Sequence, residues 1–442
     1  MNGSYNFLGF LAAVHPAPHA DEWFVLWMMI RFSGLSPKAF VHFADTDVQI
    51  AALYEPNVCV GIGGGEFDEH ARNGRLVDRS AANQAVGKLD LWLRPEVIAI
   101  MAAIHEGDVR GDQHPFNIDA LLKPITQLYP GAHELHRELG VWQWIVFDIL
   151  AGYEFADYPA INKWPGPESV NSCTDADQVF EIWKQVAAAH YATHRSCTEA
   201  IKHIHQLWHD QKGTAQLLHI RMVCHYMLTR LPPSDVYSFM APLLQGFMEK
   251  QLDITGDSRC HHEWKDAFHF IAPVETHSLI EARRHTVRIE LGVAVVQTKS
   301  PFVLAHLRRR RDIMDLARRP DVVIVLTEQD GVTKTSVWGF TPLGCAHRDH
   351  FVRCIAHREY VLNDGEKTMT RAEFDQALDQ ILAAGVSVNL PGPAAKWYLQ
   401  IGVDKKLGHA TWSLLNGTLT RYAVPTDLKP GDWKEVFDLA RI

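Results

Sequence analysis

The first 150 residues alternate short apolar runs with longer stretches of helical periodicity. Three of the runs have the length of buried strands, at Phe7–Val14, Ala39–Ala44 and Asn57–Gly61. Helical patterns lie between and after these runs, at Asp21–Phe32, Arg79–Leu91, Pro95–Glu106 and Ile118–Tyr129. This alternation predicts an α/β domain in which a mainly parallel sheet is covered by helices.

The rest of the chain divides into two further parts. A polar, proline-rich stretch over Lys163–Asp177 predicts a linker, and helical patterns follow at Asp175–Gln211, Ala215–Arg230 and Asp235–Lys250. From Thr286 onward, strand patterns (TVRIELGVAVVQT, DVVIVLTEQDG with its hairpin partner TKTSVWGF, and WYLQIG) alternate with helical ones. We therefore predict a sheet domain over residues 1–165, a helical segment over 166–285 and a smaller C-terminal α/β lobe over 286–442.

Composition excludes several classes of protein. The chain is 47% hydrophobic and 21% charged, which excludes a disordered, collagen-like or coiled-coil protein. Its formal net charge of −9 excludes a strongly basic nucleic-acid coat protein. Seven cysteines without regular spacing favour a reducing compartment over a disulfide framework. The longest apolar runs have only eight residues, too few to cross a bilayer, so the sequence predicts a cytoplasmic protein with no membrane partner.

The candidate site begins where the first predicted strand ends. The sequence HPAPHADE places His15, His19, Asp21 and Glu22 between that strand and the next helix, at the sheet edge where open α/β folds bind ligands. Two imidazoles and a carboxylate suit Mn²⁺, Fe²⁺ or Zn²⁺, and the two prolines stiffen the loop. The alternative interpretation is that the histidines cap the helix or bond loop carbonyls.

Two further motifs carry potential metal ligands. A glycine-rich turn over Gly61–Gly65 follows the third predicted strand, and Glu66-Phe67-Asp68-Glu69-His70 comes directly after it. Glycines allow backbone amides to approach an anion or a metal closely. The sequence His105-Glu106-Gly107-Asp108 ends a helical pattern and supplies another carboxylate.

In this order and spacing, the three motifs resemble those of the DHH phosphoesterase superfamily, and in particular its Myg-type branch of metal-dependent exonucleases. The resemblance covers about residues 5–112, and it also includes Gly63-Gly64 and Arg79-Ser80-Ala81-Ala82. It implies a set of metal ligands, namely His15, His19, Asp21, Glu69 and Asp108. The metal that it implies is Mn²⁺, with Mg²⁺, Fe²⁺ or Zn²⁺ as alternatives.

The chain departs from the family pattern at two positions. The strand-end Asp of the family falls on Gly61 or its neighbours, where the sequence has no carboxylate, and Glu69 stands where the family has a histidine. Glutamate can replace a histidine as a hard oxygen ligand. The missing Asp leaves three alternatives open: a site with one metal, a site that uses Glu66 instead, or a degenerate site.

The resemblance implies hydrolysis of phosphodiester bonds in a nucleotide or single-stranded nucleic acid, with a 3′-to-5′ exonuclease as the family-level expectation. A bound metal would generate hydroxide near neutral pH, and Asp68, His70 and His114 are the candidate catalytic residues. Hydrolysis of a dinucleotide or pyrophosphate is one alternative. Another is a degenerate module that binds a nucleotide or a protein without hydrolysis. The sequence leaves open whether the protein is a homo-oligomer.

A basic stretch in the C-terminal lobe is the candidate substrate-binding element. Residues 301–320 hold six arginines and two aspartates, and arginine suits bidentate contact with phosphate. We name Arg308, Arg311, Lys396 and His409 as candidate substrate-binding residues. Because consecutive residues point around a helix, a solvated basic helix face is the alternative interpretation.

Overall fold

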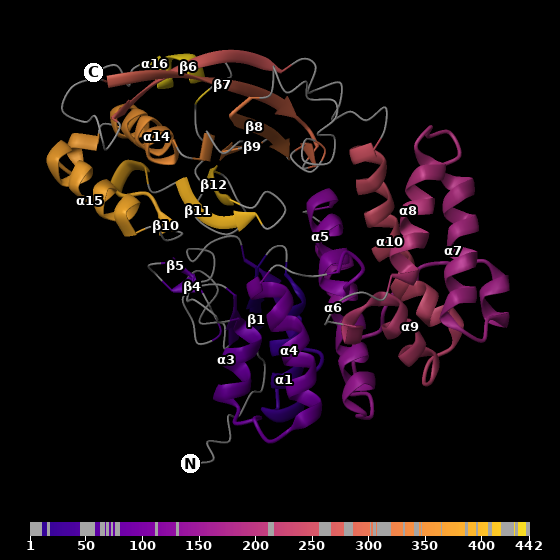
Figure 1. Cartoon of the computed structure of the whole chain (residues 1–442). Helices are drawn as coiled ribbons and strands as arrows, with labels where there is room; N and C mark the ends of the chain where they lie inside the picture. Colours follow the sequence, from indigo (N-terminus) through magenta and orange to yellow (C-terminus); the bar gives the residue numbers. More distant parts are fainter. Residues whose placement is uncertain are drawn as a thin grey trace. The chain divides into compact units, whose positions relative to one another are not determined.

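Figure 1 shows the computed structural model of the chain, which forms two compact units over residues 1–256 and 257–442. The structure describes residues 11–15, 18–44, 58–61, 67, 70–71, 74–75, 80–110, 114–129, 132–210, 216–255, 267–277, 286–300, 302–303, 306, 320–329, 332–339, 344–345, 347–363, 365–384, 388–394, 397–404, 409–416, 428 and 432–438.

The first unit contains a three-stranded parallel sheet with the order β2-β1-β3. The central strand β1 (Leu11–Val14) pairs with β2 (Phe40–Phe43) on one side and with β3 (Val58–Val60) on the other. Since all three strands run the same way, their carboxyl ends share one edge of the sheet. The predicted parallel sheet is confirmed.

Helices lie beside this sheet (Figure 1). The first is α1 (Ala20–Phe32), which packs against β3 and against α3 (Ala81–Lys88), α4 (Pro95–Arg110) and α6 (His133–Ala151). Every residue of α1 from Ala20 to Met29 is buried, so neighbouring elements enclose this part of the helix. Its residues from Trp23 to Met29 are all apolar, whereas Asp21 and Glu22 are buried carboxylates.

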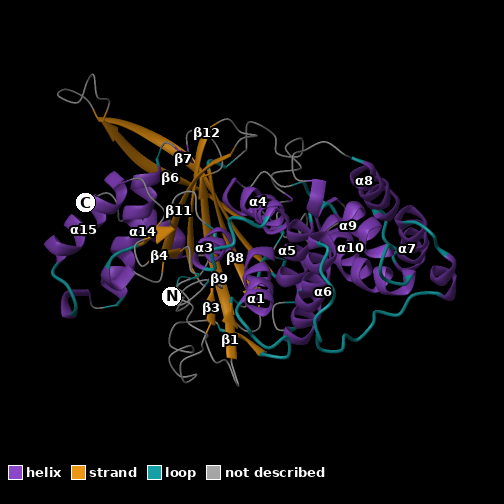
Figure 2. Ribbon diagram, turned by 90° about the horizontal axis from the view of Figure 1, so that it is seen from below, coloured by secondary structure: helices purple, strands orange, loops and turns teal. Residues whose placement is uncertain are grey.

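The helical part of the same unit consists of α5 (Ile118–Leu128), α7 (Ala176–His190), α8 (Cys197–His209), α9 (Ile220–Leu228) and α10 (Pro233–Thr255), grouped together in Figure 2. Helix α10 contacts the other four. These helices share one hydrophobic core with the sheet and with α1. The predicted single helix over Asp175–Gln211 is wrong, because a turn over residues 191–196 divides it into α7 and α8.

The predicted linker over Lys163–Asp177 is largely irregular, but it is packed against α10 inside the first unit. The Trp164 backbone N–H donates to Ser238 Oγ at 2.6 Å, and a side chain at Gly166 would meet the Tyr237 ring within 2.8 Å. Val170, in the short 3₁₀ helix Glu168–Ser172, is 1% exposed. The stretch therefore connects α6 to α7 as a fixed part of the core.

A carboxylate in α6 is fully enclosed in this core. Asp148 is 0% exposed and accepts hydrogen bonds from Trp27 Nε1 at 2.7 Å, from Arg31 Nε at 2.7 Å and from the Tyr158 hydroxyl at 2.8 Å. Arg31 Nη2 completes a forked contact with the same group. Burial, together with the charge of Asp148, raises the pKa of Tyr158 well above its usual value, so the phenol remains a donor. Asp148 thus ties α6 to α1 and to the segment that follows α6.

The described part of the second unit contains a seven-stranded sheet with the order β10-β11-β12-β9-β8-β7-β6. Its strands are β6 (Phe268–His277), β7 (Thr286–Thr298), β8 (Val322–Gln329), β9 (Val332–Gly339), β10 (Val388–Asn389), β11 (Trp397–Asp404) and β12 (His409–Asn416). Among these described strands, only β7 and β8 pair in parallel. The predicted β8–β9 hairpin is confirmed.

The α-helices in the described part of the second unit are α14 (Arg348–Leu362), α15 (Arg371–Ala384) and α16 (Asp432–Asp438). Their apolar residues form one core with residues of β7, β8, β9 and β11. At the centre of that core, Glu359 of α14 is fully buried and accepts from Trp397 Nε1 at 3.0 Å. The predicted α/β lobe is confirmed.

Candidate metal site

The candidate site is built on the first turn of α1. Strand β1 ends at Val14, His15 follows it at 8% exposure, and α1 begins at Ala20 with His19 as its N-cap residue. An extended backbone at His19 (φ −92°, ψ −179°) turns the chain from the strand into the helix. The site therefore lies at the carboxyl edge of the parallel sheet, as predicted.

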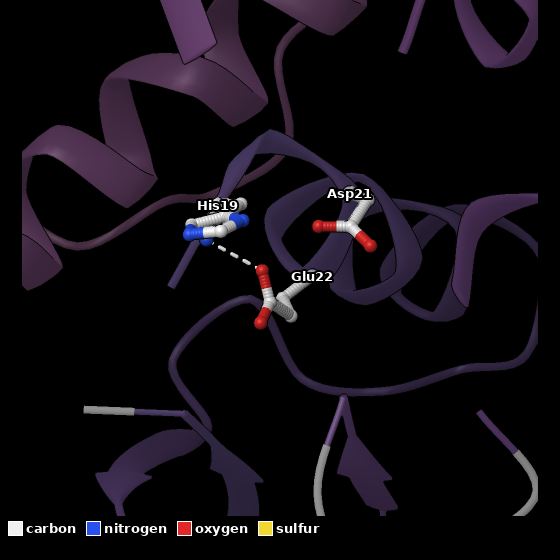
Figure 3. A group of neighbouring side chains, drawn as sticks. All are labelled: His19, Asp21 and Glu22. Atoms are coloured by element: carbon white, nitrogen blue, oxygen red, sulfur yellow. Dashed lines mark hydrogen bonds between the residues drawn. The ribbon is translucent and has the colours of Figure 1, made fainter. Parts of the chain in front are cut away.

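Three side chains converge on this turn, those of His19, Asp21 and Glu22 (Figure 3). One potential ligand atom from each lies within 4.8 Å of the others, and both carboxylates are buried, with Asp21 3% and Glu22 6% exposed. Two ligands of one cation lie at most about 4–5 Å apart, given bond lengths of roughly 2.0–2.6 Å. The group consequently has the spacing and the donor chemistry of a site for a hard divalent cation.

Glu22 is held by a backbone hydrogen bond and lies close to Gly61. Its Oε2 accepts a hydrogen bond from the His19 backbone N–H, which is one half of a capping box (Figure 3). Its Oε1 lies against Gly61, the residue that follows β3: a Cβ on Gly61 would be 2.8 Å from this oxygen. Gly61 has a φ of +67°, which glycine adopts without strain. The backbone geometry at position 61 therefore favours glycine, and a Cβ there would require the Glu22 side chain to shift.

The position of Glu22 beside Gly61 bears on the strand-end Asp of the family pattern, which this chain lacks. No acidic residue stands at the end of β3, but the Glu22 carboxylate occupies the place that a side chain at Gly61 would fill. Glu22 belongs to the first sequence motif but is not among the five ligands that the resemblance implies. The signal in the sequence is the Asp21-Glu22 pair at a helix start, although the approach to Gly61 depends on tertiary structure.

A carboxylate from another helix also reaches this turn. Asp119 lies in the first turn of α5, is 5% exposed, and accepts a hydrogen bond from the Ala20 backbone N–H at 3.0 Å. Asp119 was not predicted, since nothing in the local pattern around it distinguishes it from an ordinary helix start.

The structure also brings two of the sequence motifs together. Ser80 is the N-cap residue of α3 and accepts from the Asn83 backbone N–H at 3.2 Å, and its Oγ lies 3.0 Å from His105 Nδ1 of α4. The motif that starts at Arg79 therefore contacts the motif that ends at Asp108. Helix α4 itself continues to Arg110, beyond its predicted end at Glu106.

Most of the other predicted site residues are not tested by the structure. His15 is buried but is not one of the three residues in the group defined above, and its role as a ligand stays a prediction. Several candidates lie outside the described residues or have side chains outside them: Glu66, Asp68, Glu69, His70, Asp108, Arg308, Arg311, Lys396 and His409.

His114 lies in a second cluster of polar groups, between α4 and α5. Its Nδ1 accepts from the Phe116 backbone N–H at 3.1 Å, its Nε2 lies 3.7 Å from a carboxylate oxygen of Asp210, and its ring centroid is 4.8 Å from that of His219. Burial lowers the pKa of His114, although Asp210 opposes the shift. None of these contacts involves the first turn of α1, and the catalytic role of His114 stays a prediction.

His219 makes this cluster sensitive to pH. It caps α9 by accepting from the Arg221 backbone N–H at 3.2 Å, and burial, reinforced by His114, lowers its pKa to about 4. Unfolded histidine titrates near pH 6.5, so the unfolded state binds more protons between about pH 6.5 and 4. The free energy of unfolding should therefore fall on acidification through this window, by about 2–3 kcal/mol from this residue at pH 4.5.

We expect His219→Asn to flatten this dependence, because asparagine still caps a helix but does not titrate. Urea unfolding at pH 7.5 and pH 4.5 measures the difference between the wild type and the variant. An equal loss of stability in both proteins would contradict the assignment to His219.

Comparison of the chain with protein-family models, with curated protein sequences and with solved structures finds no match. Within the described residues, none of the helices combines the length and the apolar character needed to cross a membrane.

Proposed function

We propose that the chain is a metal-dependent phosphoesterase of the DHH type, acting on phosphodiester bonds of a nucleotide or single-stranded nucleic acid. The observation that carries the proposal is the convergence of His19, Asp21 and Glu22 at the carboxyl edge of a parallel sheet. The resemblance in sequence adds support, because its first motif, HPAPHADE, contains all three of these residues.

The donor set fits a hard divalent ion such as Mn²⁺. Two buried carboxylates offset the charge of a cation, and one imidazole adds a neutral donor. Gly61 leaves room for Glu22, since any Cβ at position 61 would displace the carboxylate. A divalent ion held there would activate water for attack on phosphorus and balance charge on the phosphoryl group.

Groups of the chain itself orient the proposed ligands and add negative charge. The His19 backbone amide holds Glu22 in one orientation, so the carboxylate needs little reorganisation when it binds a cation. Asp21 adds a second negative charge in the same turn. The exonuclease direction, the cytoplasmic location and the Arg308–Arg311 contact with substrate are further proposals that rest on the sequence and the resemblance.

Hydrolysis of a small phosphorylated molecule is the second candidate function. The formal net charge of −9 favours it, because a long polyanion is repelled by an acidic protein outside a basic groove. One hydrolysis screen distinguishes the two candidate functions. It tests single-stranded RNA, single-stranded DNA, a dinucleotide and pyrophosphate, each in the presence of Mn²⁺.

The test of the metal site is Asp21→Asn, which replaces a charged ligand with a weaker neutral oxygen. Loss of a metal-bound carboxylate should raise the Kd for Mn²⁺ at least about tenfold and lower hydrolysis in parallel. Calorimetric titration of Mn²⁺ into the metal-stripped chain gives the Kd. Asp177→Asn is the matched control, because Asp177 holds the same second position in α7 and should leave the Kd unchanged. A wild type that binds no Mn²⁺, or a variant that binds it equally well, would overturn the proposal.

A further inference from the structure

Two successive backbone amides at the start of α1 are bound by carboxylates from different parts of the chain. Glu22 accepts from the His19 N–H within the same turn, whereas Asp119 of α5 accepts from the Ala20 N–H at 3.0 Å across 99 residues of sequence. The Ala20 amide lies between the metal-binding candidates His19 and Asp21. Asp119 therefore acts on the short piece of backbone that carries all three ligands.

Asp119 is itself held in a defined position. Asn117, the N-cap residue of α5, accepts from the Asp119 backbone N–H at 3.0 Å, and Lys123 Nζ lies 3.3 Å from Asp119 Oδ2. Helix α5 is anchored in turn by α10, against which it packs. A carboxylate on a fixed helix can set the position and the rotation of the turn that it binds.

We propose that Asp119 is a positioning residue of the metal site: its hydrogen bond to the Ala20 amide holds the first turn of α1 so that His19, Asp21 and Glu22 converge. The proposal rests on the proposed function, because it assumes that these three residues bind a cation. Asp119 acts through the backbone, and the proposal requires no direct contact between Asp119 and the ion. The competing interpretation is that Asp119 is only a stabilising cap for α1.

The experiment compares Mn²⁺ binding and thermal stability in four proteins: the wild type, Asp119→Ala, Asp119→Asn and Asp175→Ala. Asp119→Ala removes the acceptor for the Ala20 amide, and we expect the Kd for Mn²⁺ to rise about tenfold, as is typical for the loss of an outer partner of a metal site. Asp119→Asn keeps an oxygen that can accept the same bond, so it should restore the Kd to within about threefold of the wild type.

Asp175→Ala is the matched control. Asp175 is the N-cap residue of α7 and accepts from the Gln178 backbone N–H at 2.9 Å, so its loss lowers stability without touching α1. We expect its melting temperature to fall by an amount similar to that of Asp119→Ala while its Kd is unchanged. The electron paramagnetic resonance line shape of bound Mn²⁺ should differ from the wild type in Asp119→Ala alone, because only there does the ligand geometry change.

Three results would overturn the inference, and they are distinguishable. An unchanged Kd and line shape in Asp119→Ala would make Asp119 a cap with no role in positioning. A Kd for Asp119→Asn as weak as that for Asp119→Ala would assign the effect to charge instead of the hydrogen bond. A wild type that binds no Mn²⁺ would remove the proposed function and this inference together, whereas the first two results leave the proposed function intact.

Discussion

Gly61→Ala should raise the Kd for Mn²⁺ at least about tenfold. The added Cβ would lie 2.8 Å from Glu22 Oε1, so the carboxylate must leave its place beside the end of β3. The hydrogen bond from the His19 amide limits where Glu22 can move. Calorimetric titration of Mn²⁺ into the metal-stripped protein measures the loss of affinity.

The chain offers a close control in Gly34→Ala. Gly34 has a φ of +76°, similar to the +67° of Gly61, but a Cβ there meets nothing within 4 Å. Both variants place alanine in the left-handed region, at a cost of roughly 1–2 kcal/mol, so both should lose comparable stability from the backbone. Only Gly61→Ala should lose Mn²⁺ affinity. Identical isotherms for the two variants would show that Glu22 is not a ligand.

Asp148→Ala should lower the free energy of unfolding by about 3–5 kcal/mol. The change leaves the Arg31 guanidinium without its carboxylate and removes the acceptor of Trp27 Nε1 and of the Tyr158 hydroxyl. Buried donors that lose their partner incur a desolvation penalty. Equilibrium unfolding in urea measures the effect, and Mn²⁺ affinity of the folded fraction should be preserved.

Asp157→Ala is the comparison for this prediction. Asp157 pairs with Lys38 at 2.6 Å, but its side chain is 84% exposed, and exposed pairs contribute about 0–1 kcal/mol. Each variant removes one aspartate from an ion pair, so the difference between the two losses measures the burial of Asp148 together with its hydrogen bonds from Trp27 and Tyr158. Equal losses would mean that Asp148 contributes no more than a surface charge.

Much of the fold could be predicted from the sequence, because local patterns decide it. The apolar run near residues 39–44 and the helical pattern over Asp21–Phe32 correspond to β2 and to α1 within one residue at each end.

Helix α6 was not predicted. Its residues from Leu139 to Ile149 are nearly all buried, and many are aromatic or β-branched, so no polar face marks the helical period. The turn between α7 and α8 was missed because it contains neither glycine nor proline.

The candidate site was predictable in its residue types but not in its geometry. His19 and Asp21 stand at a strand end in the sequence, and the structure places them together with Glu22. The contacts of Glu22 with Gly61 and of Asp119 with Ala20 join residues that are 39 and 99 positions apart. Such pairs follow from how helices and strands pack, which no local pattern encodes.

The hydrogen bonds at the start of α1 have a consequence for the proposed metal site. The positive end of a helix dipole disfavours a cation, and carboxylates on the first amides compensate for it. Here those carboxylates, Glu22 and Asp119, are held by backbone amides of the chain itself. The turn that carries the proposed ligands is therefore held in place by groups of the chain itself. Chelation should empty such a site without unfolding the domain, in contrast to small metal-dependent domains whose fold exists only when the ion is bound.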